Sequence, residues 1–313
     1  MLMKKILGIG NALVDTLIEI HDESIFSKFG LQKGGMEMIN AELKNEIHRE
    51  ILGLKQTIAS GGSASNTIYG LAQLGAQVGY IGKIGEDEVG AFFKKDMEKV
   101  GVTTHLSYSK IDTGIATTFI TKEGERTFAT YLGAAATQTP EDLQKQVFSQ
   151  YDLIHVEGYL IYNKDLILNI CKLAKKCGLK ISMDMASYNL VEVMRPLVEE
   201  LLRDYVDIIF ANEDEAFAFT HKKERDALEA LSTYCPVSVV KLGAEGSLVN
   251  VNGEISIIPA VQAHCKDSTG AGDIFAAGFL YGLTNNHTIP DAGALASKLG
   301  AKCVETIGAK IIL

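Results

Sequence analysis

One short run of residues combines the groups that phosphoryl transfer to an alcohol requires. Asp267-Ser268-Thr269-Gly270-Ala271-Gly272-Asp273 precedes an apolar stretch, 274–280, that is typical of a buried helix. The small residues Gly270, Ala271 and Gly272 allow backbone N–H groups to converge at the helix start and bind an anion. Asp273, in the first turn, is placed to take the proton of an attacking alcohol. A simple helix cap requires one Asp or Ser, so this run predicts an anion hole with Asp273 as the base.

A second run, residues 60–67, contains paired glycines before another helical pattern. Gly61 and Gly62 let a ligand approach the backbone closely. One turn later, Asn66 offers both an amide donor and an acceptor to the hydroxyls of a substrate. Taken alone, the run is equally typical of a Ser-capped helix after a loop.

Asn11 and Asp15 follow the first strand-like run of the chain. Ligands of parallel sheets bind beyond the carboxyl ends of the strands, where these two side chains are expected. Asp15 alternates with apolar neighbours and therefore also fits the solvent face of a strand. Its position favours a role in binding a diol.

Two further groups follow buried strand-like runs. Asn212 and Glu215 have the spacing that shares one face of a short helix, and Glu215 suits Mg²⁺, directly or through water. An acidic helix start favoured by the helix dipole is the alternative. Lys241, Gly243 and Gly246 follow another strand and are candidates for a place along a nucleotide, although this junction alone is unremarkable.

Several other enzyme classes lack their motifs. There is no G-x-x-x-x-G-K-[ST], no H-E-x-x-H and no G-x-S-x-G. Gly8-Ile9-Gly10 begins a dinucleotide fingerprint, but Leu13 stands where its third glycine belongs.

Composition points to an ordinary globular protein. The 313 residues are 47% hydrophobic and carry a net charge of −9, which repels phosphate backbones and disfavours nucleic acid as a partner. The five scattered cysteines fit a reducing compartment, and no apolar run reaches the roughly 20 residues that span a bilayer. We therefore expect a cytoplasmic protein without a signal peptide or a membrane segment.

Buried apolar runs alternate with helical patterns along most of the chain. The strand-like runs lie at 5–10, 78–81, 153–156, 180–183, 206–210 and 237–240, and the helical patterns at 64–75, 87–99, 164–177, 190–203, 212–219 and 223–233. This alternation predicts an α/β protein, a three-layer sandwich around a mostly parallel sheet.

Two stretches break this rhythm. Residues 13–20 and 36–39 read as neighbouring strands, and 115–121 and 126–131 flank a hairpin turn at 122–125. We expect a small antiparallel sheet that acts as a lid, formed by about 12–40 and 113–132. With no linker or repeat, a single domain over 1–313 is preferred.

Taken together, the motifs resemble the ribokinase-like, or PfkB, carbohydrate kinases. Residues 267–273 are similar to the C-terminal signature of that family, 61–66 to its N-terminal signature, and 212–215 to its N-x-x-E motif. The resemblance implies an ATP-dependent kinase with Asp273 as base and the 270–272 amides as anion hole. It places Asn212 and Glu215 around Mg²⁺ and phosphates, and Lys241, Gly243 and Gly246 near ATP. It implies that Asn11, Asp15, Gly61, Gly62 and Asn66 hold the acceptor, and makes Asp267 and Thr269 candidates for a K⁺ shell.

The acceptor is read from the same resemblance. Residues 10–15, 62–66, 126–135 and 155–159 are similar to adenosine-kinase-type members, which implies the 5′-hydroxyl of a nucleoside, adenosine above all. Residues 239–246 follow the sugar-kinase pattern instead, so a sugar such as ribose or fructose remains the alternative. A non-catalytic metabolite-binding protein ranks below both because Asp273 is present. Arg126 on the lid could contact phosphate or solvent, and both a monomer and a homodimer are open.

Overall fold

The computed structural model describes residues 4–123 and 125–311, and its larger part is built on a nine-stranded sheet. The strand order is β14-β13-β12-β11-β10-β9-β1-β5-β6. All pairs from β12 to β6 are parallel, whereas β13 and β14 add an antiparallel edge. The bounds are β1 (Ile6–Ile9), β5 (Val78–Gly85), β6 (Thr103–Ser109), β9 (Leu153–Val156), β10 (Lys180–Asp184), β11 (Ile208–Asn212), β12 (Val237–Lys241), β13 (Ser247–Val251) and β14 (Glu254–Ile258). The predicted mostly parallel sheet is confirmed.

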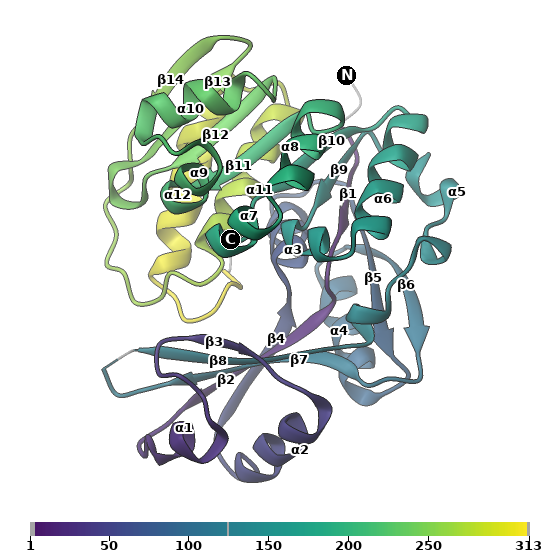
Figure 1. Cartoon of the computed structure of the whole chain (residues 1–313), viewed down its shortest axis with the longest axis vertical. Helices are drawn as coiled ribbons and strands as arrows, with labels where there is room; N and C mark the ends of the chain where they lie inside the picture. The colour runs from purple at the N-terminus through teal and green to yellow at the C-terminus, as the bar shows by residue number, and fades with distance from the viewer. Residues whose placement is uncertain (1–3, 124, 312–313) are drawn as a thin grey trace.

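Helices cover both faces of this sheet, as the alternation of strand and helix patterns predicts (Figure 1). Successive strand side chains point to opposite faces. Leu7 and Ile9 of β1 therefore join one buried cluster, and Ile6 joins the other. One face carries α5 (Lys145–Phe148), α6 (Lys164–Lys176), α7 (Tyr188–Val193), α8 (Arg195–Asp204), α9 (Glu213–Thr220) and α10 (Glu224–Ser232). The other carries α3 (Ser63–Gln73), α4 (Glu88–Lys99), α11 (Ala271–Thr284) and α12 (Ile289–Val304).

The helix expected over 190–203 is two helices in the structure. α7 ends at Val193 and α8 begins at Arg195, with Pro196 in the first turn of α8. Proline lacks the N–H that a continuous helix requires at that point, which explains the break.

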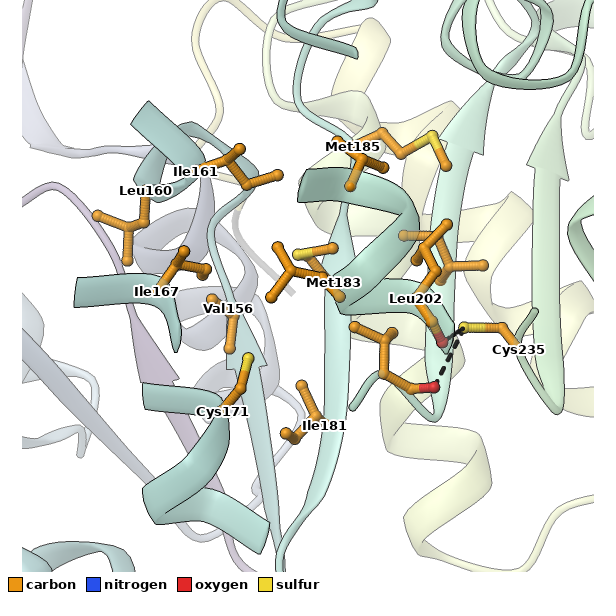
Figure 2. Close-up of a cluster of buried hydrophobic side chains, with 14 of the residues drawn as sticks. Val156, Leu160, Ile161, Ile167, Cys171, Ile181, Met183, Met185, Leu202 and Cys235 are labelled. Atoms are coloured by element: carbon orange, nitrogen blue, oxygen red, sulfur yellow. Dashed lines mark hydrogen bonds between the residues drawn. The ribbon is translucent and has the colours of Figure 1, made fainter. Parts of the chain in front are cut away.

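The α6–α10 side of the core is closely packed and apolar. Figure 2 shows Cys171 of α6 among Val156 and Ile181 of the sheet, all without solvent exposure. The thiol of Cys235 is buried as well and donates to the carbonyl oxygens of Val206, at 3.2 Å, and Leu202. Burial raises the pKa of the Cys171 and Cys235 thiols to about 12, so these two cysteines serve packing rather than reactivity.

A smaller sheet of five strands projects from the sandwich, below it in Figure 1. Its order is β3-β8-β7-β2-β4, with bounds β2 (Leu13–Glu19), β3 (Met36–Met38), β4 (Gln56–Gly61), β7 (Thr113–Ile120) and β8 (Arg126–Gly133). The predicted hairpin of β7 and β8 is confirmed as antiparallel, although its predicted turn includes residue 124, which lies outside the described residues.

The predicted antiparallel pairing is present in the small sheet, at β7–β8 and at β2–β4, but the sheet also contains parallel pairs. β2 pairs with β7 in parallel, and β3 with β8 in parallel. The expected neighbours β2 and β3 are separated by β7 and β8, because α1 (Ser24–Phe29) carries the chain across the sheet between them. β4 was not predicted as a strand at all, and it leads through Gly62 directly into α3.

The two faces of the small sheet have different neighbours. Ile18 and Phe119 pack against α1 and α2 (Ala41–Glu50), which cover the face away from the sandwich. Strand alternation places Asp15 and its register partners Ala59 and Ala116 on the opposite face. None of the helices in residues 4–123 and 125–311 is long and apolar enough to span a membrane.

Candidate active site

Asp273 lies in the first turn of α11, where the sequence predicts it. The turn into this helix requires glycine at position 270, because its φ is +74° and a Cβ there would overlap Ala309. The close contact of residue 309 fixes the loop that contains the predicted anion hole. The helix dipole and the unpaired amides of its N-terminus therefore point toward the region beside Asp273.

The Asp273 carboxylate is held by two donors from the first turn of α3. Ser63 Oγ donates to Oδ1 at 2.7 Å, and Asn66 Nδ2 donates to Oδ2 at 2.9 Å. Burial raises the pKa of Asp273 to about 6 even though both donors lower it. The two glycine-rich runs, far apart in sequence, thus meet at one carboxylate whose pKa is raised. Ser63 was not predicted to contact Asp273, although it stands in the run that contains Asn66.

Lys241 supplies a positive charge next to the predicted anion hole. Its Nζ lies next to Gly272. A Cβ added at Gly272 would be only 2.9 Å from this Nζ, so an alanine at that position would crowd the ammonium. Asp184, at the end of β10, pairs with Lys241 at 2.9 Å. Burial disfavours the ammonium, but the carboxylates of Asp184 and Glu215 raise the pKa of Lys241 above its ordinary value. Asp184 was missed from sequence because it belongs to no glycine-rich or acidic run.

Asn212 and Glu215 form a reciprocal cap at the start of α9. The Glu215 N–H donates to Asn212 Oδ1 at 2.8 Å, while the N–H of Asn212 donates to Glu215 Oε2 at 2.8 Å and its Nδ2 to Oε1 at 3.0 Å. Burial, and then the charge of Asp184, raises the pKa of Glu215 to about 7. The two residues lie together at the start of a short helix, as their spacing predicts, but both Glu215 oxygens are already bonded.

This arrangement bears on where a divalent cation would fit. No group of three His, Cys, Asp or Glu side chains within the described ranges is arranged as a complete metal site. Mg²⁺ commonly keeps several waters and binds through one or two carboxylates together with substrate phosphates. The Asp184 and Glu215 carboxylates around Lys241 fit such an indirect role.

Gly243 and Gly246 form a tight turn directly after Lys241. Both have positive φ values, +53° and +98°, and Leu242 N–H donates to the Gly246 carbonyl at 2.8 Å. A Cβ at Gly246 would overlap the carbonyl oxygen of Ile258, so glycine is required there for the β12–β13 turn itself. Their predicted place along ATP remains a prediction.

On the other side of Asp273, Asn11 and the paired glycines meet Glu157. Asn11 Nδ2 donates to Glu157 Oε1 at 2.5 Å, and the Ala64 N–H donates to Oε2 at 3.2 Å. Gly62 has a φ of +92°, and a Cβ there would overlap the carbonyl oxygen of Asn11. Burial raises the pKa of Glu157 to about 7. Glu157 therefore ties the end of β1 to the start of α3, a role that sequence did not assign.

Asp15 lies against Gly61, where a side chain would overlap its carboxylate. Burial raises the pKa of Asp15 to about 6, the Lys310 ammonium lowers it, and the charge of Asp273 raises it further. Asp15, Asp273 and Asn66 are thus gathered at the junction of the two sheets, as the sequence predicts.

Arg126 crosses from the small sheet to the loop before α11. Its guanidinium pairs with Asp267 Oδ2 at 2.6 Å and donates to Thr269 Oγ1 at 3.0 Å, and the Arg126 side chain is only 12% exposed. The N–H groups of Thr269 and Gly308 also donate to Asp267. Arg126 is therefore neither solvent-exposed nor free. The K⁺ shell expected at Asp267 and Thr269 stays a prediction, and in the structure these side chains bind a guanidinium.

Four aromatic residues, Tyr69, Phe119, Phe128 and Tyr131, are candidates from the sequence for a clamp on a purine, and they differ in position. Phe119 is fully buried against Phe26 on the covered face of the small sheet and cannot contact a ligand. Tyr69 and Tyr131 each lie under a lysine ammonium. Phe128 lies on the same face of the small sheet as Asp15. It pairs with Thr118, which is two residues from Ala116, and Ala116 is the register partner of Asp15.

Comparisons with known proteins identify the family of this chain. Residues 36–313 match the pfkB family carbohydrate kinases. The chain is similar to an adenosine kinase of Saccharomyces cerevisiae, 28% identical over 96% of this chain and 94% of the yeast protein. It is also similar to an uncharacterized sugar kinase of Archaeoglobus fulgidus, 28% identical over 77% of this chain and 96% of that protein.

Solved structures with the same fold cover the whole chain. An adenosine kinase from Sinorhizobium meliloti is 34% identical with a TM-score of 0.88, over 99% of this chain and 97% of that one. A probable sugar kinase from Rhizobium etli is 30% identical with a TM-score of 0.90, over 100% and 96%. Because the family model matches residues 36–313 and these relatives are similar along the chain, this chain belongs to the pfkB family of carbohydrate kinases and is an ATP-dependent kinase.

Proposed function

We propose that this kinase transfers the γ-phosphoryl group of ATP to the 5′-hydroxyl of adenosine. The single observation that carries the chemistry is Asp273, held by Ser63 and Asn66 at the start of α11 with its pKa raised to about 6. A base with that pKa is ionised at neutral pH and still accepts a proton as the alcohol attacks. The choice of adenosine is supported by the similarity to adenosine kinases along nearly the full chain.

Different residues serve the two ends of the reaction. Lys241 and the N–H groups at Gly270, Ala271 and Gly272 would stabilise charge on the transferred phosphoryl group. Mg²⁺, held through phosphates and the region of Glu215 and Asp184, would neutralise the polyphosphate. Gly243 and Gly246 would border the nucleotide.

The acceptor would lie between the sandwich and the small sheet, which acts as its lid. Asp15 and Asn11 would bind its hydroxyls, with Gly61 and Gly62 allowing close approach and Asn66 aligning both acceptor and base. The N–H of Ala64 and the side chain of Asn11 already converge on Glu157, which keeps this wall rigid.

A sugar acceptor is the second candidate within the same chemistry. The run Val239-Val240-Lys241-Leu242-Gly243 follows the sugar-kinase pattern, and the Rhizobium etli relative is a probable sugar kinase at 30% identity. The two candidates share every catalytic residue and differ only in what fills the space beside Asp15.

ADP release tests both candidates. The purified protein with Mg-ATP would be offered adenosine, other nucleosides, ribose and fructose, with and without K⁺. We expect turnover on adenosine at a KM in the micromolar range, which is common for enzymes acting on scarce metabolites. Turnover only on a sugar would keep the mechanism and reject adenosine. Silence on every acceptor in both buffers would reject the proposal.

A further inference from the structure

The segment after α12 contacts residues 267–270, the loop that contains the predicted anion hole. Gly308 N–H donates to Asp267 Oδ2 at 2.5 Å, and Ala309 fills the space that a side chain at Gly270 would need. Gly308 also lies beside Leu17 of the lid, where a Cβ would be 3.6 Å from the Leu17 side chain. Residue 310 therefore emerges between lid and sandwich, at the level of Asp15 and Asp273.

The ammonium of Lys310 lies between the lid and the sandwich and is not held there by a hydrogen bond to a described residue. The Nζ atom is buried, yet it has no hydrogen-bond partner in the part of the chain that the structure describes. It lies 4.1 Å from the centre of the Tyr69 ring. The charges of Asp15, Asp96 and Asp273 act on it, but none of these carboxylates accepts a hydrogen bond from it.

Two of the three carboxylates that act on Lys310, those of Asp96 and Asp273, already have other partners. Asp96 accepts from the N–H and Oγ of Ser60 at 3.0 and 2.8 Å. Asp273 accepts from Ser63 and Asn66. A buried ammonium that lacks acceptors is costly, so a ligand that brings an oxygen into hydrogen-bond distance gains affinity from it.

We propose that Lys310 is a specificity-determining residue of the acceptor site, whose ammonium donates a hydrogen bond to an oxygen of an uncharged polyhydroxylated acceptor held by Asp15. An ammonium and a carboxylate side by side offer a donor and an acceptor to neighbouring hydroxyls. The acceptor is uncharged because three carboxylates and one ammonium surround the space, so an anionic substrate is repelled. The proposal rests on the acceptor site described under the proposed function, but not on adenosine as its occupant.

Lys310→Met tests the assignment, with Lys44→Met as the matched control. Lys44 also lies over a tyrosine ring, that of Tyr131, but it pairs with Asp112, which immediately precedes β7. With whichever acceptor the unmodified enzyme uses best, Lys310→Met should raise the acceptor KM by about 10- to 100-fold, the loss expected for one hydrogen bond to a charged group. The KM for ATP should change less than about twofold in both variants.

Lys310→Arg keeps the charge and should recover part of the acceptor affinity, which a packing role alone would not do. An unchanged acceptor KM in a folded Lys310→Met variant overturns the proposal. So does a rise confined to the ATP KM, which would place the ammonium at the phosphates.

Thermal shift without ATP separates this proposal from the proposed reaction. Adenosine, ribose and fructose serve as uncharged probes, and gluconate and ribose 5-phosphate as anionic ones. At least one uncharged probe should raise the Tm of the unmodified protein and of Lys44→Met, but much less that of Lys310→Met, even if no turnover is found. Stabilisation by the anionic probes alone, or by none of the probes, overturns the assignment.

The pH profile gives an independent readout. Burial lowers the pKa of Lys310 to about 8, against the opposing charges of Asp15, Asp96 and Asp273, and Tyr69 faces it from α3. Acceptor kcat/KM should therefore fall as pH rises through about 8, because the ammonium loses its proton, and this limb should vanish in Lys310→Met. A limb that persists in the variant contradicts the proposal.

Discussion

Two partly buried lysines flank Asp273, and they differ in their electrostatic surroundings. Lys241, on the proposed ATP side, pairs with Asp184 at 2.9 Å, and neighbouring carboxylates raise its pKa despite burial. Lys310, on the proposed acceptor side, hydrogen-bonds to no described residue, and burial lowers its pKa to about 8. A lysine ammonium is thus fixed by an ion pair in one half of the site and has no hydrogen-bond partner among the described residues in the other.

The difference follows from what each half binds. A transferring phosphoryl group carries high charge in every substrate, so a pre-positioned cation stabilises it without reorganisation. The acceptor, in contrast, differs between members of one family. An ammonium that has no protein partner is available to form hydrogen bonds with that acceptor. We infer that the ATP side is built for rate and the acceptor side for selection.

Asp273→Asn should have the largest effect, because it removes the base on which the transfer depends. With no proton acceptor, kcat should fall by about 10³- to 10⁴-fold, while ATP binding measured by calorimetry stays intact. Asp226→Asn, an exposed position on α10, is the matched control. Turnover within tenfold of the unmodified enzyme would remove Asp273 from the role of base.

Lys241→Met should come next and should affect only the ATP side. It removes a charge beside the anion hole and leaves Asp184 without its partner, so we expect kcat to fall by about 100-fold and the KM for ATP to rise. The acceptor KM should not change, the reverse of the pattern predicted for Lys310→Met. Lys180→Met, an exposed lysine paired with Asp207, controls for the substitution itself. If both active-site variants raised the same KM, the division into two halves would be wrong.

The acid limb of the pH profile sharpens the comparison. Asp273 acts only when ionised, so kcat should fall as pH drops through about 6, the raised pKa that burial gives it. Lys241 lowers this pKa, so Lys241→Met should move the limb to higher pH. A limb that stays in place, measured in matched buffers from pH 5 to 8, would show that the charge of Lys241 does not reach the base.

Arg126→Gln should have the smallest effect of this series. The ion pair with Asp267 joins the lid to the loop before α11, so its loss should increase hydrogen exchange in β8 and lower kcat by about tenfold or less. Arg203→Gln breaks an exposed pair with Asp204 and is the control, expected to be near neutral. Unchanged exchange in β8 would mean that the pair does not hold the lid.

The sequence was most informative where one local rule decides the structure. Buried runs such as 153–156 became strands of the parallel sheet, and the 267–273 run predicted Asp273 at a helix start. Hydrophobic period and turn chemistry are local properties, so a single sequence reveals them. The partners Ser63 and Asn66 could be suspected only because they stand in a second glycine-rich run.

Residues that act through tertiary contact were not found from sequence. Asp184 ends an ordinary buried strand, and Lys310 follows a helix in a stretch without any motif. Their importance arises from neighbours that are distant along the chain, Lys241 and Asp15. The prediction that β2 and β3 are neighbouring strands is wrong for the same reason, because strand order depends on crossovers that the residue pattern of β2 and β3 does not encode.

The proposed acceptor site joins residues near the two ends of the described chain, with Asn11 and Asp15 just after the central strand β1 and Lys310 just after α12. Such contacts close the longest loops of the chain, so the site is complete only in the fully folded protein. A tight acceptor analogue should then act as a pharmacological chaperone. By binding only the fully closed chain, it would raise the yield of folded protein from variants that are otherwise degraded.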